Sequence, residues 1–176
     1  KIGKSAFEYC ADLDGQDDDY AIVIPDKVTE IGESAFANTR KLYKITLSSA
    51  MTAIPDSAFY QSGLVELKLP DNIKTVGAQA YFRTERLNSL DLGKVESIGE
   101  KAFSELQLME TVTIPDTVTT LGVNSFANPV KLKTVTLGSG LTEIGDGSFY
   151  SADSLDAVTI PVSVTKIGKR AFWNCG

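Results

Sequence analysis

The stretch IPDTVTTLGVNSF at residues 114–126, followed after a turn by LKTVTL at residues 132–137, decides the fold of this chain. Variants of a related phrase, Ile-Gly-x-x-Ala-Phe, recur eight times along the 176 residues. The aromatic residues of these copies are Phe7, Phe36, Phe59, Tyr81, Phe103, Phe126, Phe149 and Phe172. Because they are spaced by 29, 22 or 23 residues, the chain is predicted to be a stacked repeat array rather than a closed globule.

The segment at 132–137 has the spacing of a half-buried strand. Val135 and Leu137 alternate with threonines, which is typical of a strand with one face buried. The equivalent pairs are Ile22/Ile24, Ile45/Leu47, Leu67/Leu69, Leu90/Leu92, Val112/Ile114 and Val158/Ile160. We therefore expect one strand from each coil to pair in parallel with the next.

A second short segment, such as residues 118–121, is also rich in β-branched residues. It ends on glycine in six of the seven complete repeats, which suits a positive φ or a close approach of two backbones. The tetrapeptide that follows, as at residues 33–36, is expected to form a short helical turn with its aromatic ring inward. Stacked rings then form a continuous apolar spine.

The consensus Leu-x-x-Val-x-Ile-Pro-x-x-Val-Thr-x-Ile-Gly-x-x-Ala-Phe-x-x-Cys resembles the BspA-type leucine-rich repeat, also called the Treponema pallidum class. Its best matches are residues 22–36, 109–126 and 155–175. The resemblance implies a curved right-handed solenoid with a parallel sheet on one side. It also implies a surface-exposed or secreted protein of an adhesive class. Tyr81 and Pro55 depart from the consensus without threatening the fold.

The expected fold is a leucine-rich-repeat solenoid, a β-rich α/β superhelix of about seven to eight stacked coils. Each coil contains a parallel-sheet strand, a second short extended segment and a short helical turn. Residues 1–176 are interpreted as a single solenoid and a fragment of a longer array, because both ends fall inside a repeat. The 29-residue interval contains an acidic insertion loop at residues 14–21, and the 22-residue intervals reflect deletions near Gly63 and at Gly93.

Composition narrows the class of partner. The hydrophobic content of 43% is enough for a substantial core, and no apolar run approaches the roughly 18 to 20 residues that cross a bilayer. The net charge of −6 argues against a nucleic-acid partner, since phosphate binding needs clustered Lys and Arg. Most of that charge comes from five aspartates near the N-terminus, so the rest of the chain is close to neutral.

The two cysteines occupy the same place in the repeat. Cys10 follows Phe7 by three residues and Cys175 follows Phe172 by three. At the spacing of adjacent strands, seven coils separate them by on the order of 34 Å, whereas a disulfide tolerates about 7 Å between Cα atoms. We therefore expect no bridge between them and interpret both as small core fillers.

No residue set indicates a reaction. The chain has no histidine, which removes the commonest general base and most zinc sites, and its glycines recur singly with the repeat. We therefore predict that the protein is not an enzyme and needs no cofactor. The acidic segment offers carboxylates of the kind that bind Ca²⁺, although it lacks the EF-hand pattern and a solvated loop is the other interpretation. Its aspartates are Asp12, Asp14, Asp17, Asp18 and Asp19.

Two surfaces are candidates for partner binding. The outward positions of the predicted sheet include Lys44, Glu66, Lys68, Asp91, Thr113 and Thr136. The position after the spine aromatic holds Tyr60, Phe82, Tyr150 and Trp173, and aromatic side chains concentrate binding energy at interfaces. Each surface also has a structural interpretation: threonine ladders satisfy strand preference, and the aromatics pack half-buried between neighbouring turns.

The function expected from these features is a non-catalytic, cell-surface or secreted adhesion module that presents a solenoid face to a protein or glycan. Two alternatives remain. The chain is a structural spacer or stalk that positions another domain, or it is a module that binds its partner through calcium held by the acidic loop.

Overall fold

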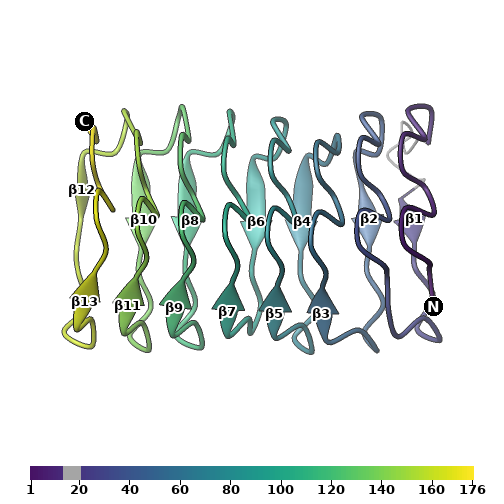
Figure 1. The fold of residues 1–176 in the computed structure, drawn as a ribbon, viewed down its shortest axis with the longest axis horizontal. Coiled ribbons are helices and arrows are strands. Elements are labelled where there is room, and N and C mark those ends of the chain that lie inside the picture. Colours follow the sequence, from purple (N-terminus) through teal and green to yellow (C-terminus); the bar gives the residue numbers. More distant parts are fainter. Residues whose placement is uncertain (14–20) are drawn as a thin grey trace.

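The computed structural model describes residues 1–13 and 21–176. The chain winds into an elongated solenoid whose turns follow one another from the N-terminus to the C-terminus (Figure 1). All strand pairs among the described residues are parallel. The strands are β1 (Ile22–Val23), β2 (Ile45–Thr46), β3 (Ala53–Ile54), β4 (Glu66–Lys68), β5 (Thr75–Val76), β6 (Ser89–Asp91), β7 (Ser97–Ile98), β8 (Thr111–Thr113), β9 (Thr120–Leu121), β10 (Thr134–Thr136), β11 (Glu143–Ile144), β12 (Ala157–Val158) and β13 (Lys166–Ile167).

Two parallel arrays of strands line opposite sides of the solenoid (Figure 1). One is a continuous six-stranded sheet in the order β13-β11-β9-β7-β5-β3. The other consists of three shorter sheets, β1-β2, β4-β6 and β12-β10-β8. Both extended segments expected in a coil are therefore strands in the coils from β2/β3 to β12/β13, and the second segment forms the longest continuous sheet.

The register of the strands follows the sequence repeat. Val135 of β10 lies opposite Val112 of β8, with the threonines on either side also paired. Both valines are buried, whereas their neighbouring threonines are exposed. The alternation predicted from the period of two is confirmed at these strands, because the inward residues meet the core and the threonines meet solvent.

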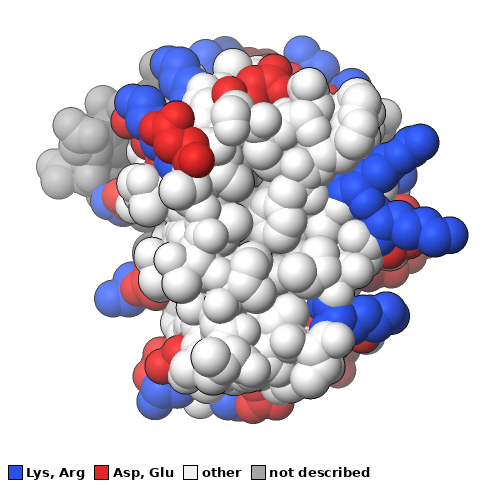
Figure 2. Space-filling view, turned by 90° about the vertical axis from the view of Figure 1, so that its left-hand side faces the viewer, with Lys and Arg blue, Asp and Glu red and all other residues white. Residues whose placement is uncertain are grey.

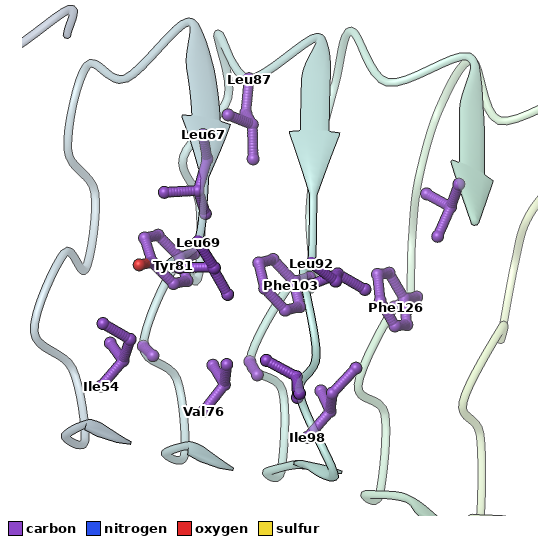
Figure 3. Packing of buried hydrophobic residues seen from close by; sticks show 14 of the residues in the cluster. Ile54, Leu67, Leu69, Val76, Tyr81, Leu87, Leu92, Ile98, Phe103 and Phe126 are labelled. Atoms are coloured by element: carbon purple, nitrogen blue, oxygen red, sulfur yellow. The ribbon is translucent and has the colours of Figure 1, made fainter. Parts of the chain in front are cut away.

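The spine aromatics form one unbroken stack. Seven successive ring pairs from Phe7 to Phe172 have centroid separations of 5.0 to 5.6 Å and interplanar angles no larger than 13°. Figure 3 shows three of these rings between the leucines of one array and the branched side chains of the other. The predicted spine is confirmed, and its inner rings are fully buried.

The predicted helical turn is wrong, since the described residues contain no helix. The residues two before and two after each spine aromatic have positive φ, for example Lys101 (52°) and Glu105 (62°) around Phe103. A run of right-handed residues cannot continue through these positions, so no helix forms. The Ala-Phe pair instead lies in a backbone that alternates between negative and positive φ.

That alternating backbone bonds each turn to the next. The N–H of Phe59 donates to the carbonyl of Ala80 (2.8 Å), and the N–H of Phe103 donates to the carbonyl of Ser125 (2.8 Å). The intervening N–H groups close tight turns within the coil, as Tyr60 does to the Ser57 carbonyl (3.0 Å). Backbone groups that a helix would satisfy internally are satisfied between turns instead.

The recurrent glycine is needed for close approach rather than for positive φ. A Cβ on Gly122 would lie 2.6 Å from the carbonyl carbon of Gly99, and one on Gly99 would lie 2.7 Å from that of Gly77. These glycines stack directly on one another, so no side chain fits between successive turns. The left-handed positions two residues later are held mostly by polar non-glycine residues.

The solenoid contains six turns in which both extended segments are strands, from β2 and β3 to β12 and β13. The seven to eight coils expected from the aromatics are therefore not reached. Residues 28–31, which follow β1, form no strand, so Phe36 belongs to a turn with one strand, and residues 1–13, which contain Phe7, form no strand at all. The insertion predicted at residues 14–21 lies almost entirely outside the described residues.

Seen from its C-terminal end, the solenoid shows an end face that is mostly uncharged, with charged side chains around its edge (Figure 2). Most ion pairs join equivalent or adjacent positions of neighbouring turns, such as Lys133 with Glu110 (3.0 Å) and Lys166 with Glu143 (2.5 Å). Because these side chains are largely exposed, each pair contributes little to stability. The core and the backbone ladders hold the turns together.

The expectation that both cysteines fill the core is wrong for Cys10, which is exposed, while Cys175 is half-buried and both are free thiols. The equivalent residues of the following turns, among them Thr39, Ser62 and Thr84, are buried. Cys10 lies in an incomplete first turn, so its site lacks the cover that the same site has elsewhere.

The stacked glycines generate a stability prediction. Gly122→Ala places a methyl group against the Gly99 backbone and is expected to lower the free energy of unfolding by about 1–3 kcal/mol. Gly3→Ala changes the same position of the repeat where nothing lies within 4 Å, so it is expected to be neutral. Chemical denaturation measures both variants, and equal stabilities would contradict the close-approach explanation.

A substitution at Tyr81 is expected to stabilise the fold rather than destabilise it. The Tyr81 hydroxyl is buried and has no hydrogen-bond partner among the described residues, and burial raises its pKa well above the ordinary value. Because an unsatisfied buried hydroxyl is costly, Tyr81→Phe is expected to raise the free energy of unfolding by about 1 kcal/mol. The half-exposed Tyr60 provides the control, since Tyr60→Phe removes a solvated hydroxyl. Thermal melts that show no gain for Tyr81→Phe would overturn this prediction.

Candidate functional site

The residues that directly follow the spine aromatics form an outward column along the solenoid. The aromatic ring points into the core, so the next side chain points outward, and stacking brings equivalent positions together. Tyr60 stacks on Phe82 with ring centroids 5.5 Å apart, and Tyr150 stacks on Trp173 at 4.8 Å. The two aromatic pairs are separated by Ser104 and Ala127, both buried.

This sequence of large, small and large side chains creates a groove of about 650 Å³. Tyr60 and Phe82 line one part of it and Tyr150 another. From Phe82 to Tyr150 the chain advances three turns, which is about 15 Å at strand spacing. The Ser104 hydroxyl donates to the Ala127 carbonyl (3.0 Å), so the floor offers no unsatisfied polar group. We call this hollow the aromatic groove.

Several charges on the rim of the aromatic groove are already paired. Arg83, beside Phe82, donates to Glu105 (2.9 Å), and this carboxylate raises the pKa of the guanidinium. Lys101 pairs with Glu100 at 3.4 Å, and Asp146 accepts the Lys169 N–H at 2.8 Å. The lining of the groove is therefore mixed: aromatic and apolar side chains alternate with polar and charged ones, and some of the charges are paired within the protein.

The charged patch predicted on the sheet face is brought together over β2, β4 and β6. Its four residues line a shallow hollow of about 550 Å³, and Lys44 forms an ion pair with Glu66 at 2.8 Å. The four are Lys44, Glu66, Lys68 and Asp91.

The two threonines predicted on the same face are placed differently. Thr136 lines a second hollow of about 640 Å³ over β10 and β12, and Thr113 is exposed on β8 between the two. The ten predicted partner-binding residues thus divide between the strand array of β2 to β12 and the aromatic groove over the segments that follow β3 to β13.

The predicted calcium ligands fall mainly outside the described residues. Asp14, Asp17, Asp18 and Asp19 lie there, while Asp12 accepts a hydrogen bond from Lys41 at 2.7 Å. That bond is the main cause of the lowered pKa of Asp12. Residues 1–13 and 21–176 contain no group of three His, Cys, Asp or Glu side chains that could hold a metal ion.

One further hollow was not predicted from the sequence. It has a volume of about 430 Å³ and is lined by three arginines, Arg40, Arg83 and Arg86, together with Glu85 and the short segment 61–63. The sequence does contain a hint of this site, because these are three of the four arginines in the chain. They come from two coils that flank the shortened coil at Gly63, and only stacking of those coils shows that the three converge.

In the described part of the chain, no helix has the length and apolar character needed to cross a membrane. The free thiol of Cys175 is half-buried. Burial is the main cause of its raised pKa, and its Sγ lies 3.4 Å from the Phe149 carbonyl oxygen, which accepts its hydrogen bond.

Comparisons with known proteins agree with this architecture. The model of the BspA type leucine rich repeat region matches six copies over residues 1–128 and 81–176. A leucine-rich repeat protein from Eubacterium ventriosum is 27% identical, with a TM-score of 0.82, over 88% of this chain and 42% of that one. A search of curated proteins finds no match.

Two further solved structures share the fold at lower identity. A leucine rich cell surface protein from Faecalibacterium prausnitzii is 23% identical, with a TM-score of 0.58, over 97% of this chain and 54% of that one. The T. pallidum leucine rich repeat protein is 21% identical, with a TM-score of 0.62, over 95% and 65%. The chain spans less than two thirds of the length of each of these three structures.

The second sheet hollow generates a pH prediction. Asp116 accepts hydrogen bonds from the Ser139 N–H (2.6 Å) and hydroxyl (3.0 Å), and the backbone bond is the main cause of its lowered pKa. A carboxyl with a folded pKa below its unfolded value stabilises the fold above the unfolded pKa, and this is lost as pH falls through the folded pKa. Asp116→Asn is therefore expected to lower the melting temperature near neutral pH.

The difference between Asp116→Asn and the unmodified chain is expected to shrink as the pH falls well below 3.8, the ordinary pKa of the group. Melting curves across this range measure it, with the exposed Asp156→Asn as the control. A difference that stays the same at every pH would show that the charge of Asp116 has no stabilising role.

Proposed function

The chain belongs to the BspA-type leucine-rich repeat family, and we propose that it is a non-catalytic interaction module that binds a macromolecular partner in the aromatic groove. Family membership rests on a family model whose matched ranges together span the whole chain. The proposed location is the cell surface or the extracellular space. The description of the Faecalibacterium prausnitzii structure as a leucine rich cell surface protein supports this location.

The observation that carries the proposal is the pair of aromatic stacks that flank two small residues. Trp173 is 51% exposed and Val123, on the groove wall, is 44% exposed. Aromatic rings that are partly exposed, rigidly stacked and grouped around a hollow provide large apolar contact area at low entropic cost. Ordinary packing between turns requires neither the exposure nor the gap left by Ser104 and Ala127.

The sheet face is the weaker candidate. Its threonines satisfy strand preference, and its charged hollow contains an internal ion pair between Lys44 and Glu66. A partner would have to displace or accommodate that pair, which gains little in water. In the aromatic groove, Phe82 is contacted by the Arg83 guanidinium at 5.3 Å from its ring centroid, whereas no such cation contact involves Tyr60, Tyr150 or Trp173 among the described residues.

A stiff spacer is the second candidate function. The unbroken aromatic stack and the continuous six-stranded array favour it, because each turn is fixed rigidly to its neighbours. A spacer, however, does not need aromatic side chains in the outward column. The two functions are separated by whether substitution in the groove changes binding while the fold remains intact.

The test uses the double variant Tyr150→Ala/Trp173→Ala, measured for adhesion to immobilised extracellular-matrix proteins and to an oligosaccharide array. Loss of Tyr150 from the groove lining and of Trp173, which stacks on it, is expected to weaken binding at least tenfold, since each such anchor typically contributes about 2 kcal/mol or more. Trp173 is the only tryptophan, so binding by the unmodified chain is also expected to change its fluorescence.

Tyr9→Ala is the matched control, because Tyr9 is an exposed aromatic outside the groove. Equal adhesion by the double variant, the control and the unmodified chain would favour the spacer. Repeating the measurement in EDTA tests the calcium-dependent alternative. Loss of binding on chelation would favour the acidic segment as the binding element.

A further inference from the structure

The distribution of arginine in this chain is uneven. The protein has a net charge of −6 and only four arginines, yet Arg40, Arg83 and Arg86 line one hollow of about 430 Å³. The only carboxylate in its lining is Glu85. An acidic protein that gathers most of its guanidinium groups around one depression presents a local positive field opposite to its net charge.

The hollow exists because one coil is short. Leu64 follows Phe59 by five positions, whereas in the next coil Leu87 follows Tyr81 by six. The residue before Leu64 is Gly63, and a Cβ there would lie 2.1 Å from the Arg40 carbonyl oxygen. The shortened coil therefore forms a low floor between two coils that carry long cationic side chains.

Two of the guanidinium groups are held in place by aromatic rings. The Arg86 guanidinium lies 5.1 Å from the centroid of the Tyr43 ring, and that of Arg83 lies 5.3 Å from the Phe82 centroid. Cation–π contact restrains an otherwise mobile side chain, which lowers the entropic cost of binding a ligand. Arg83 is also fixed by Glu105.

The positive charge of the hollow is only partly compensated. Among residues 1–13 and 21–176, neither Arg40 nor Arg86 forms an ion pair with a carboxylate, although Glu85 lies in the same lining. Arginine presents a planar fork that matches carboxylate and sulfate oxygens. The residues thus have the chemistry of an anion site, with donors fixed on two sides of a floor that carries no acidic side chain.

We propose that this arginine hollow binds the carboxylate or sulfate groups of an acidic glycan. The choice of a glycan follows from its junction with the aromatic groove, which meets it at the contact between Arg83 and the Phe82 ring. A sugar can lay its apolar face on the Tyr60 and Phe82 rings while its anionic substituent reaches the guanidinium groups. This assignment presupposes the interaction module proposed above and names its class of partner.

The test is calorimetric titration of the full chain at low salt with five probes. They are a heparin hexasaccharide, a hyaluronan hexasaccharide, neutral maltohexaose, inorganic sulfate and decaglutamate. An acidic hexasaccharide is expected to bind at least tenfold more tightly than maltohexaose, inorganic sulfate or decaglutamate, and to weaken as salt screens the charges. Sulfate or decaglutamate binding as tightly as the best hexasaccharide would overturn the choice of a glycan.

The variant Arg40→Gln/Arg86→Gln removes the two guanidinium groups without a carboxylate partner and is expected to weaken the acidic hexasaccharide at least tenfold. Its control, Lys27→Gln/Lys131→Gln, has the same net charge. Lys131 occupies the repeat position of Arg86 in another coil and lies outside the hollow. Equal losses in both variants would show a general charge effect and overturn the site.

Gln61→Glu is a second, nearly isosteric variant that places a carboxylate on the wall of the hollow, and it is expected to abolish acidic-glycan binding without changing the melting temperature. Unchanged affinity would contradict the assignment. Failure of this glycan site can be distinguished from failure of the proposed interaction module. If matrix proteins still bind and depend on Tyr150 and Trp173 while no acidic glycan binds, the module stands and the arginine hollow is not its site.

Discussion

The structure depends on the hydrogen bonds that join the aromatic segment of each turn to the next. Alternate residues with right- and left-handed backbone direct every second N–H towards the following turn, as in the bond from Phe126 to the Ser148 carbonyl at 2.9 Å. This ladder sets the separation of the turns. The rings then stack at 5.0 to 5.6 Å, and the glycine column must be free of side chains. Each of these features fails if the turns move apart.

This constraint divides the residues of every coil into two groups. The inward positions and the glycines are restricted by their neighbours in both adjacent turns, and they repeat. The outward positions meet solvent, and they vary. The aromatic groove and the arginine hollow both arise from such variation: the small residues Ser104 and Ala127 open the groove, and the short coil at Gly63 opens the arginine hollow. The two proposed binding sites therefore lie where the chain departs from its repeat.

The sequence predicted the parts of the fold that depend on periodicity. The inward strand residues, both extended segments and the aromatic stack follow from the spacing of apolar residues. The helical turn was wrongly predicted because one turn of helix would also point Ala102 and Phe103 inward, whereas the positive φ at Lys101 and Glu105 is imposed by bonds to the next turn. The helix propensities of single residues do not reveal hydrogen bonds between turns.

The candidate sites were predictable only in part. Tyr60, Phe82, Tyr150 and Trp173 share one position of the repeat, so the sequence predicted that they lie in one column. The arginine hollow was missed because Arg40, Arg83 and Arg86 occupy three different repeat positions. Their convergence depends on the shortened coil between them, and the volume it leaves can be seen only in three dimensions.

Amide hydrogen exchange of the spine residues tests the central claim most directly. If the alternating backbone bonds each turn to the next, the N–H groups of Phe59, Phe103 and Phe126 exchange as slowly as those of strands β8 and β10. The account predicts strong protection at these amides, although they lie in segments without helix or strand. Rapid exchange at all three, with β8 and β10 still protected, would show that the ladder does not hold the turns together.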